Sequence, residues 1–265
     1  MTTLLNGSIN DRIVTIGRSF YNIRSSFKVL FGLIDVGTHM SLIRLNTGKF
    51  IIIDTIEIDI ELKMYIDELT NNGELIEAVL ATHPFHTVYF PAFYKLYPNA
   101  KYYGCPRHIK NITSIIWEGN FQNESTLKLW ESENIFLRIP DGAEFINPAE
   151  TNHFSSVFVF HQPSRTIHVD DTIGYHHNPG CVLRCVAGAR ANKMNFWNLK
   201  IGLKHDNDAP MQFKRWIEKL ILDWDFDNVC TAHTANKIGG AKEELRQTLD
   251  RDEAKLISLS KKYNK

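Results

Sequence analysis

Cysteine is scarce in this sequence, and its apolar runs are all short. The longest of them, residues 27–34, is far shorter than the roughly 20 residues of a membrane-spanning helix. Residues 1–12 are polar and carry no apolar core of signal-peptide length. Four cysteines in 265 residues are too few and too scattered for a disulfide framework. We therefore expect a cytoplasmic protein with reduced thiols and no membrane partner. The cysteines are Cys105, Cys181, Cys185 and Cys230.

Net charge is also absent, because 30 basic residues balance 30 acidic ones. An overall field that would attract nucleic acid is therefore missing, and we expect no nucleic-acid partner. Hydrophobic residues make up 43% of the chain and aromatic residues 11%, which indicates a well-buried globular protein. The chain shows no internal repeat and no linker-like segment, so we expect a single domain over residues 1–265.

The Cys181-x-x-x-Cys185 spacing has two interpretations. It fits two small residues on a buried segment, and it also fits a metal or redox pair. The first interpretation is favoured.

Strand and helix patterns alternate in the first half of the chain. Two apolar runs flank Asn46-Thr-Gly-Lys49, which predicts a β-hairpin. A helical spacing of Leu62, Tyr65, Ile66 and Leu69 follows, with a stop at residues 71–73. The remaining predicted elements are a strand at 12–17, a strand at 76–82, a helix at 91–97, a strand at 101–104 and a polar helix at 107–117.

The second half begins with strands and ends with helices. Residues 156–160 and 166–169 bracket Gln162-Pro-Ser-Arg165, which predicts another hairpin. Asp208 is predicted to cap a helix with Phe213, Trp216, Ile217, Leu220 and Ile221 on one face. A strand at 227–232 and a charged C-terminal helix after Gly239-Gly240 complete the pattern, which predicts helices outside two sheets.

Histidine and aspartate side chains stand where several predicted strands begin or end. His83, Asp171 and His233 each follow a strand, and His153 precedes one. Imidazole and carboxylate ligands at one rim suit zinc, iron or manganese. Taken singly, each histidine is also explained as a hydrogen-bonded residue, and Asp171-Thr172 as a turn cap. His176, His177 and His205 are interpreted as ordinary loop residues.

Taken together, these segments resemble the metallo-β-lactamase superfamily over most of the chain. The strand ending at Asp54-Thr55 resembles the Asp-x-Gly strand of that family, and Thr82-His83 the start of its His-x-His-x-Asp-His signature. Further matches are His153-Phe-Ser-Ser-Val157 to the third-histidine segment, His168-Val-Asp-Asp171-Thr-Ile to the Gly-Asp-Thr segment and Cys230-Thr-Ala-His233 to the last histidine motif. The resemblance implies an α/β, four-layer αββα sandwich with Asp171 as a bridging carboxylate.

The first signature is incomplete in this chain. Counting from His83, the second histidine, the aspartate and the next histidine of the family are replaced by Phe85, Thr87 and Val88. His86 falls between them, at a position that the family does not use. Ordinary two-metal hydrolysis, with a hydroxide shared between the ions, is therefore not expected.

Two functional interpretations remain open. In the first, His83, His153, Asp171 and His233, with His86 turned inward, hold one divalent metal, with zinc favoured over iron or manganese. The protein is then a hydrolase acting on a small ester, lactone or thioester. In the second, the site is metal-free and the protein binds a ligand or a partner without catalysis.

The aromatic residues of this region also have two interpretations. Phe85, Tyr89, Phe90 and Phe93 either line a binding wall or pack the helix that follows the signature. An iron-dependent redox protein is a third, less favoured functional class, and a dimer is compatible with the C-terminal helix.

Overall fold

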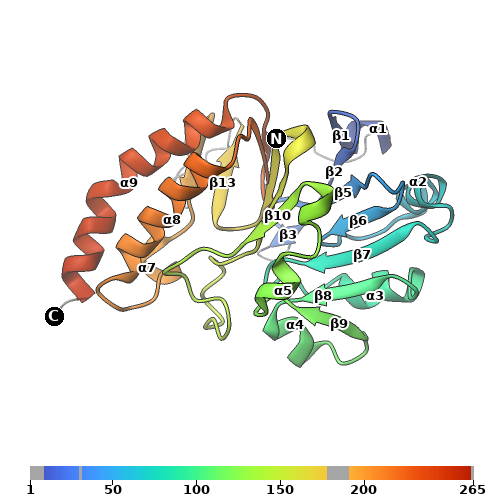
Figure 1. Ribbon diagram of the computed structural model, residues 1–265, viewed down its shortest axis with the longest axis horizontal. Helices are drawn as coiled ribbons and strands as arrows, with labels where there is room; N and C mark the ends of the chain where they lie inside the picture. Colours follow the sequence, from blue (N-terminus) through green and yellow to red (C-terminus); the bar gives the residue numbers. More distant parts are fainter. Residues whose placement is uncertain (1–8, 30–31, 178–190, 264–265) are drawn as a thin grey trace. The chain divides into compact units, whose positions relative to one another are not determined.

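The computed structural model describes residues 9–29, 32–177 and 191–263. Its chain divides into two compact units, Met1–Phe136 and Leu137–Lys265. Each unit combines one main sheet with its own helices (Figure 1). The Cys181/Cys185 pair lies outside the described residues, whereas Cys105 and Cys230 are described and both are buried.

The first unit is built on a seven-stranded sheet with the order β1-β2-β5-β6-β7-β8-β9. Strands β1, β2, β5 and β6 pair antiparallel, and β6 to β9 run parallel. The segment that connects β2 to β5 contains a small two-stranded sheet of its own, β3-β4. The elements are α1 (Ile9–Arg12), β1 (Ile13–Ile16), β2 (Phe20–Ser25), β3 (Lys28–Val29), β4 (Ile34–Asp35), β5 (Thr38–Arg44), β6 (Phe50–Ile53), α2 (Ile60–Thr70), β7 (Ile76–Ala81), α3 (Phe90–Leu96), β8 (Lys101–Gly104), α4 (Pro106–Asn111), β9 (Trp117–Asn120), α5 (Glu124–Leu127) and the 3-10 turn η1 (Glu131–Glu133).

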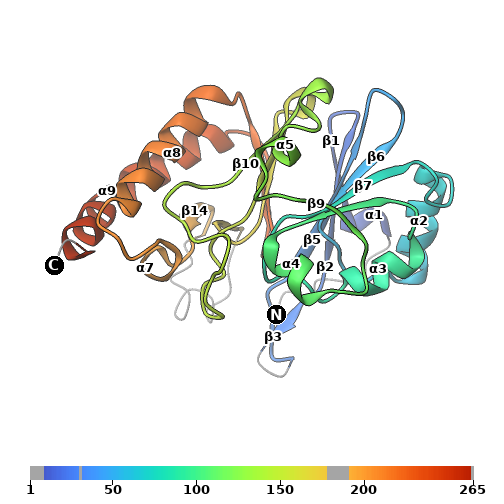
Figure 2. The same cartoon turned by 60° about the horizontal axis from the view of Figure 1, so that its bottom comes forward.

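Helices α2 and α3 cover one face of this sheet, as Figure 2 shows. Leu62 and Ile66 of α2 and Phe90 and Phe93 of α3 belong to one buried cluster with inward-facing strand residues such as Val79. Phe90 and Phe93 are fully buried, so they pack the helix against the sheet rather than line a binding wall. Their burial contributes to the apolar stabilisation of this unit.

The ends of α2 follow from short-range chemistry. Asp59 caps the helix, because its Oδ1 accepts the N–H of Leu62 at 2.8 Å. Asn71 ends the helix in the left-handed conformation, with φ at 50°. The Asn-Asn-Gly stop predicted from the sequence is confirmed.

The second unit is built on a five-stranded sheet with the order β10-β11-β12-β15-β16, whose first strand contains the boundary between the units. Strands β11 and β12 form the predicted hairpin, and β12 pairs parallel with β15. Strands β13 and β14 make a separate two-stranded sheet. The elements are β10 (Ile135–Arg138), β11 (Phe158–His161), the 3-10 turn η2 (Gln162–Ser164), β12 (Thr166–Val169), β13 (Ile173–His176), β14 (Lys193–Phe196), α7 (Leu199–Gly202), α8 (Ala209–Asp223), β15 (Asn228–Thr231), β16 (Asn236–Lys237) and α9 (Ala241–Tyr263).

Helices α8 and α9 run side by side in this unit (Figures 1 and 2). Aromatic contacts join α8 to the sheet: Trp216 meets Phe158 edge-to-face at 5.0 Å between ring centroids, and Trp224, just after α8, stacks on Phe160 at 5.1 Å. The predicted apolar face of α8 is therefore confirmed as the buried one.

Two local predictions are wrong. The polar helix predicted for 107–117 is α4, which ends at Asn111, and Trp117 instead begins strand β9. Asp208 precedes α8, but its side chain does not cap the helix. Oδ1 of Asp206 accepts the N–H groups of Asp208 and Ala209 instead, at 3.1 and 2.8 Å. Among the described residues, the helices are all too short or too polar to cross a bilayer.

Candidate metal centre

In the first unit, an aspartate and a histidine follow two neighbouring parallel strands. Asp54 comes directly after β6, and Thr82-His83 after β7. The carboxyl ends of parallel strands meet at one edge of a sheet, which is where open α/β sheets bind ligands. The N–H of Thr82 donates to Oδ1 of Asp54 at 3.0 Å, which ties the two strand ends together.

Residues 83–88, here called the histidine loop, bring two imidazoles together. The N–H of His86 donates to the carbonyl of His83 at 3.0 Å, which closes a tight turn. The two rings lie 4.1 Å apart between centroids. His83 is fully buried, and the His86 side chain is 20% exposed. The structure therefore places His86 beside His83, although no superfamily ligand corresponds to it.

Phe85 occupies the position of the missing second histidine. The guanidinium of Arg107 lies over its ring, 4.4 Å from the centroid. Thr87 and Val88 replace the remaining ligands, and Val88 is exposed. None of these three side chains offers an imidazole or a carboxylate.

His108, on α4, contacts the histidine loop through the backbone carbonyl of His86. It is fully buried, and its Nε2 lies 3.1 Å from the carbonyl oxygen of His86. The rings of Phe90 and Trp117 pack against it at 5.2 and 5.8 Å. Burial lowers the pKa of His108 to about 4, so the ring is neutral at neutral pH and Nε2 carries the proton that it donates.

Asp54 and His39 form a second polar group of the first unit. The Asp54 carboxylate is 1% exposed, and its Oδ2 lies 3.6 Å from Nδ1 of His86. His39 is equally buried on β5, and its ligand nitrogen lies within 4.8 Å of an Asp54 oxygen. Sequence reasoning noticed Asp54 only as a family landmark and missed His39.

In the second unit, the parallel strands β12 and β15 also end on acidic and histidine residues. Asp170 and Asp171 follow β12, and His233 follows β15 by one residue. Nε2 of His233 lies 3.1 Å from Oδ1 of Asp171, so two of the predicted ligands are in direct contact. Thr234 beside them has φ at 68°, a strained value for a β-branched residue. Such strain is frequent at functional sites.

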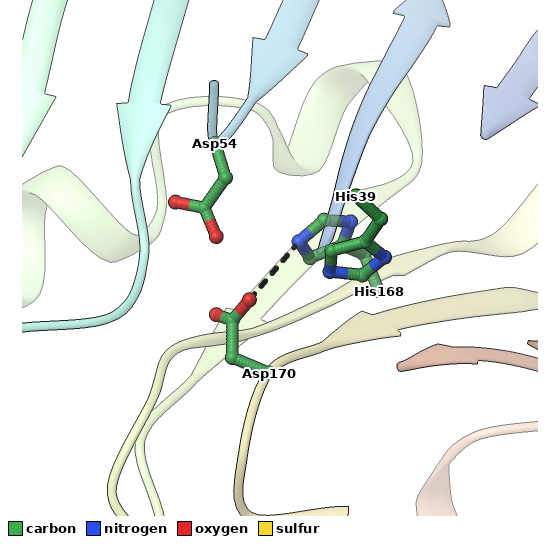
Figure 3. Close-up of side chains that lie close together, drawn as sticks. All are labelled: His39, Asp54, His168 and Asp170. Atoms are coloured by element: carbon green, nitrogen blue, oxygen red, sulfur yellow. Dashed lines mark ion pairs between the residues drawn. The ribbon is translucent and has the colours of Figure 1, made fainter. Parts of the chain in front are cut away.

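The same unit contains a fully buried pair that sequence reasoning did not select. Figure 3 shows His168 and Asp170, with a dashed line from Nε2 to Oδ1 that is 3.7 Å long. The position of His168 inside β12 could have signalled it, because a histidine in a wholly buried strand needs a polar partner.

The remaining histidines of this unit have local contacts. Nε2 of His153 lies 3.1 Å from the carbonyl of Glu150, and the prediction that His153 is a ligand stays a prediction. His176 is not a loop residue, because it ends β13 and is buried, which lowers its pKa. His205 stacks on Tyr263 at 4.9 Å, and His177 is exposed.

The residues of both units suit a metal ion. Among the described residues, those whose ligand atoms meet the spacing of a metal site are His39, Asp54, His83 and His86 in the first unit and His168, Asp170 and Asp171 in the second. Imidazole nitrogens and carboxylate oxygens are the donors that zinc, iron and manganese take in proteins. The donor set therefore fits a divalent metal.

Among known proteins, the chain is similar to solved structures, whereas searches with its sequence find no match. No protein-family model matches the chain, and no curated protein matches it. Solved structures of metallo-β-lactamases do match. One from Erythrobacter litoralis, with β-mercaptoethanol in its active site, has a TM-score of 0.60 and 12% identity, covering 90% of this chain and 96% of that one.

Two further matches have similar values. DIM-1 exposed to ceftazidime has a TM-score of 0.58 and 15% identity, covering 91% of this chain and 96% of that one. FIM-1 from Pseudomonas aeruginosa, in its mono-zinc form, has a TM-score of 0.58 and 9% identity, covering 90% and 94%. The similarity spans both units, with their mixed sheets and flanking helices. The fold of this chain is therefore the metallo-β-lactamase fold.

Proposed function

We propose that this protein is a metal-dependent hydrolase with one divalent ion, acting on a small ester, lactone or thioester. The observation that carries the proposal is the position of its imidazole and carboxylate side chains. They follow the parallel strands β6, β7, β12 and β15 of a metallo-β-lactamase fold. Zinc is the favoured ion, and iron or manganese would accept the same donors.

The candidate ligands are His83 and His86 in the first unit and His153, Asp171 and His233 in the second. A divalent ion with an open position supplies a bound water of lowered pKa and polarises a substrate carbonyl. The protein contributes orientation: the Asp171 carboxylate holds the His233 imidazole at 3.1 Å, and His108 fixes the carbonyl of His86 at 3.1 Å.

A single ion is favoured by the altered signature. Phe85, Thr87 and Val88 replace three ligands, and the Phe85 ring is covered by Arg107. The mono-zinc form of FIM-1 shows that a protein of this fold can be isolated with one ion. The same substitutions support the rival function, a binding protein without metal or catalysis.

Metal analysis tests the proposal directly. The protein is purified without chelator, and its zinc, iron and manganese contents are measured beside those of Asp171→Asn and His153→Ala. We expect about one ion per chain in the parent and a large loss in the variants. A His83→Ala variant tests whether the first unit serves the same ion. Equal metal content in the parent and Asp171→Asn would refute the assignment of Asp171.

Activity is measured on the metal-loaded protein. The panel contains a nitrophenyl ester, a lactone, a thioester and ceftazidime, the last because the similar structures are β-lactamases by name. Turnover of one class that disappears with chelator and returns with zinc would support the hydrolase. A metal-loaded protein that turns over no member of the panel would support the binding function instead.

A further inference from the structure

We propose that Thr234 is a positioning residue, which holds the His233 imidazole against the Asp171 carboxylate. The inference lies within the second unit, and its consequence for metal binding rests on the proposed function. Nε2 of His233 lies 3.1 Å from Oδ1 of Asp171. The two residues follow different strands, so contacts between the ends of those strands decide whether the imidazole and the carboxylate meet.

His233 lies in a tight hairpin turn between β15 and β16. Cys230 pairs with Asn236, and continuing that register leaves residues 232–234 as a three-residue loop. The last residue of such a loop takes the left-handed conformation, for which glycine is the usual choice. Thr234 occupies that position here, with φ at 68°.

A threonine is an unfavourable residue at this position. A β-branched side chain in the left-handed region is a genuine outlier. A residue keeps such a conformation only where the surrounding structure imposes it, and residues of this kind cluster at functional sites. Glycine would adopt the conformation freely, but it has no hydroxyl. The hydroxyl is therefore the part of Thr234 that we expect to offset the strain.

The hydroxyl of Thr234 joins the turn to strand β13. It donates to the carbonyl of Tyr175, and it lies 2.7 Å from the carbonyl oxygen of His233. Thr234 and Tyr175 also form an isolated parallel bridge. Strand β13 begins at Ile173, close behind Asp171 in the chain. The Thr234 hydroxyl thus fastens the turn that carries His233 to the strand that continues from Asp171.

Other contacts of the turn fix the backbone of His233. Its carbonyl accepts the N–H of Ala235 at 3.0 Å, and the hydroxyl of Thr231 lies 2.9 Å from the same oxygen. On β16, the ammonium of Lys237 lies over the Tyr175 ring, 5.8 Å from its centroid, which is a further contact with β13. Contacts of this kind orient histidine ligands in metal sites.

The test compares matched variants. Thr234→Val keeps the shape of the side chain and removes the hydroxyl, whereas Thr234→Ser keeps the hydroxyl. Thr166→Val is the control, because Thr166 is a fully buried threonine of the same unit whose hydroxyl donates to the carbonyl of Ser164 at 3.0 Å. Thr166 lies at the end of β12 away from Asp171.

Zinc is titrated against a competing chelator, and the ligand-field spectrum of the cobalt(II) form reports the arrangement of the donors. We expect Thr234→Val to weaken zinc binding about 10–100-fold, the usual effect of losing an outer-shell contact, and to change the cobalt spectrum. Thr234→Ser and Thr166→Val should stay within about threefold of the parent, below that range, with unchanged spectra.

A second measurement needs no metal. At a fixed pH, the NMR signals of the His233 ring nitrogens report the contact with Asp171 in the metal-free protein. Asp171→Asn supplies the signals of a ring without that carboxylate. Thr234→Val should move the parent signals toward those of Asp171→Asn, and Thr234→Ser should leave them closer to the parent.

Two results would overturn the assignment. One is a set of ring signals that Thr234→Val leaves unchanged, and the other is a zinc affinity of Thr234→Val equal to that of Thr166→Val. If the parent binds neither zinc nor iron(II), the proposed metal function fails, and the ring signals still decide whether Thr234 positions His233. If Thr234→Val does not fold, Thr234→Gly decides in its place, because glycine adopts the left-handed backbone without strain.

Discussion

His108 illustrates how one buried side chain can hold a loop that carries candidate ligands. It donates to the carbonyl of His86 and is enclosed by Phe90 and Trp117. We expect His108→Ala to lower the free energy of unfolding by about 3 kcal/mol, since it leaves a cavity and a carbonyl without its donor. His108→Gln, whose amide can reach the place of Nε2, should lose less. Guanidinium denaturation of both variants measures the difference, and equal losses would contradict the hydrogen-bond role.

His161 should make stability depend on pH. Burial lowers its pKa to about 4 from 6.5, so the unfolded chain binds a proton that the folded protein does not. The free energy of unfolding therefore falls as pH drops from 6.5 toward 4, by up to about 1.4 kcal/mol per pH unit from this residue. Urea denaturation between pH 4 and 7 measures the slope.

The matched variant is His161→Asn, which keeps a polar group near Ser164, the partner of Nδ1 at 2.8 Å. The variant should have a shallower slope than the parent across that pH range and the same slope above pH 7. Identical slopes below pH 6.5 would mean that His161 is protonated equally in both states.

Candidate residues could be predicted only where they terminate a recognisable strand. His83, Asp171 and His233 satisfy that condition, and the Asp171–His233 contact is found. His39 begins a strand and His168 lies within one, so neither satisfies that condition. Their significance depends on long-range partners such as Asn22 for His39, which no local pattern specifies.

Helix α8 provides a test at the scale of one element, because its two faces differ in burial. Trp216 is 8% exposed and packs on Phe158, whereas Leu222 on the same helix is 82% exposed. We expect Trp216→Ala to cost about 3–5 kcal/mol of unfolding free energy and Leu222→Ala less than about 0.5 kcal/mol. Chemical denaturation monitored by circular dichroism measures both. Similar losses would contradict the packing of α8 on the sheet.

Helices with a clear apolar periodicity and hairpins with a distinct turn sequence were predictable. The short strand β9 was not. The hairpin at Asn46-Thr-Gly-Lys49 and helix α2 follow from turn chemistry and capping. Strand β9 was not predicted, and its first residue, Trp117, was placed at the end of the helix predicted for 107–117. Its position is set by parallel pairing of Tyr102 with Trp117, a tertiary contact that local propensity does not contain.

At the scale of the whole molecule, a bound metal should raise thermal stability. A ligand at 100 times its dissociation constant stabilises the folded state by about 2.7 kcal/mol, or about 5–10 °C in Tm for a chain of this size. We expect zinc to produce such a shift in the parent and chelator to reverse it. Magnesium, which prefers oxygen ligands, is the control ion. An unchanged Tm with zinc, iron(II) and manganese would favour the metal-free binding protein.

The fold as a whole was predictable because several motifs occur in the right order, although each motif is weak. Identities of 9–15% to the similar structures leave almost no sequence signal beyond those motifs. The division into two compact units was not anticipated, and the single-domain prediction stays a prediction. The boundary between the two units falls inside strand β10 and not in a polar linker. The amino-acid composition therefore does not change there.

The parallel pairing of β12 with β15 has a consequence for how the chain is made. Thr166 pairs with Asn228, so Asp171 can meet His233 only after the ribosome has released the intervening helix α8. Closing a loop of that length costs on the order of 4 kcal/mol of chain entropy, which α8 must offset by packing early. The seven-stranded sheet of the first unit has all its strands by Asn120 and can form during synthesis. Truncated nascent chains should therefore acquire protease resistance in two steps, with the residues of the second unit protected last.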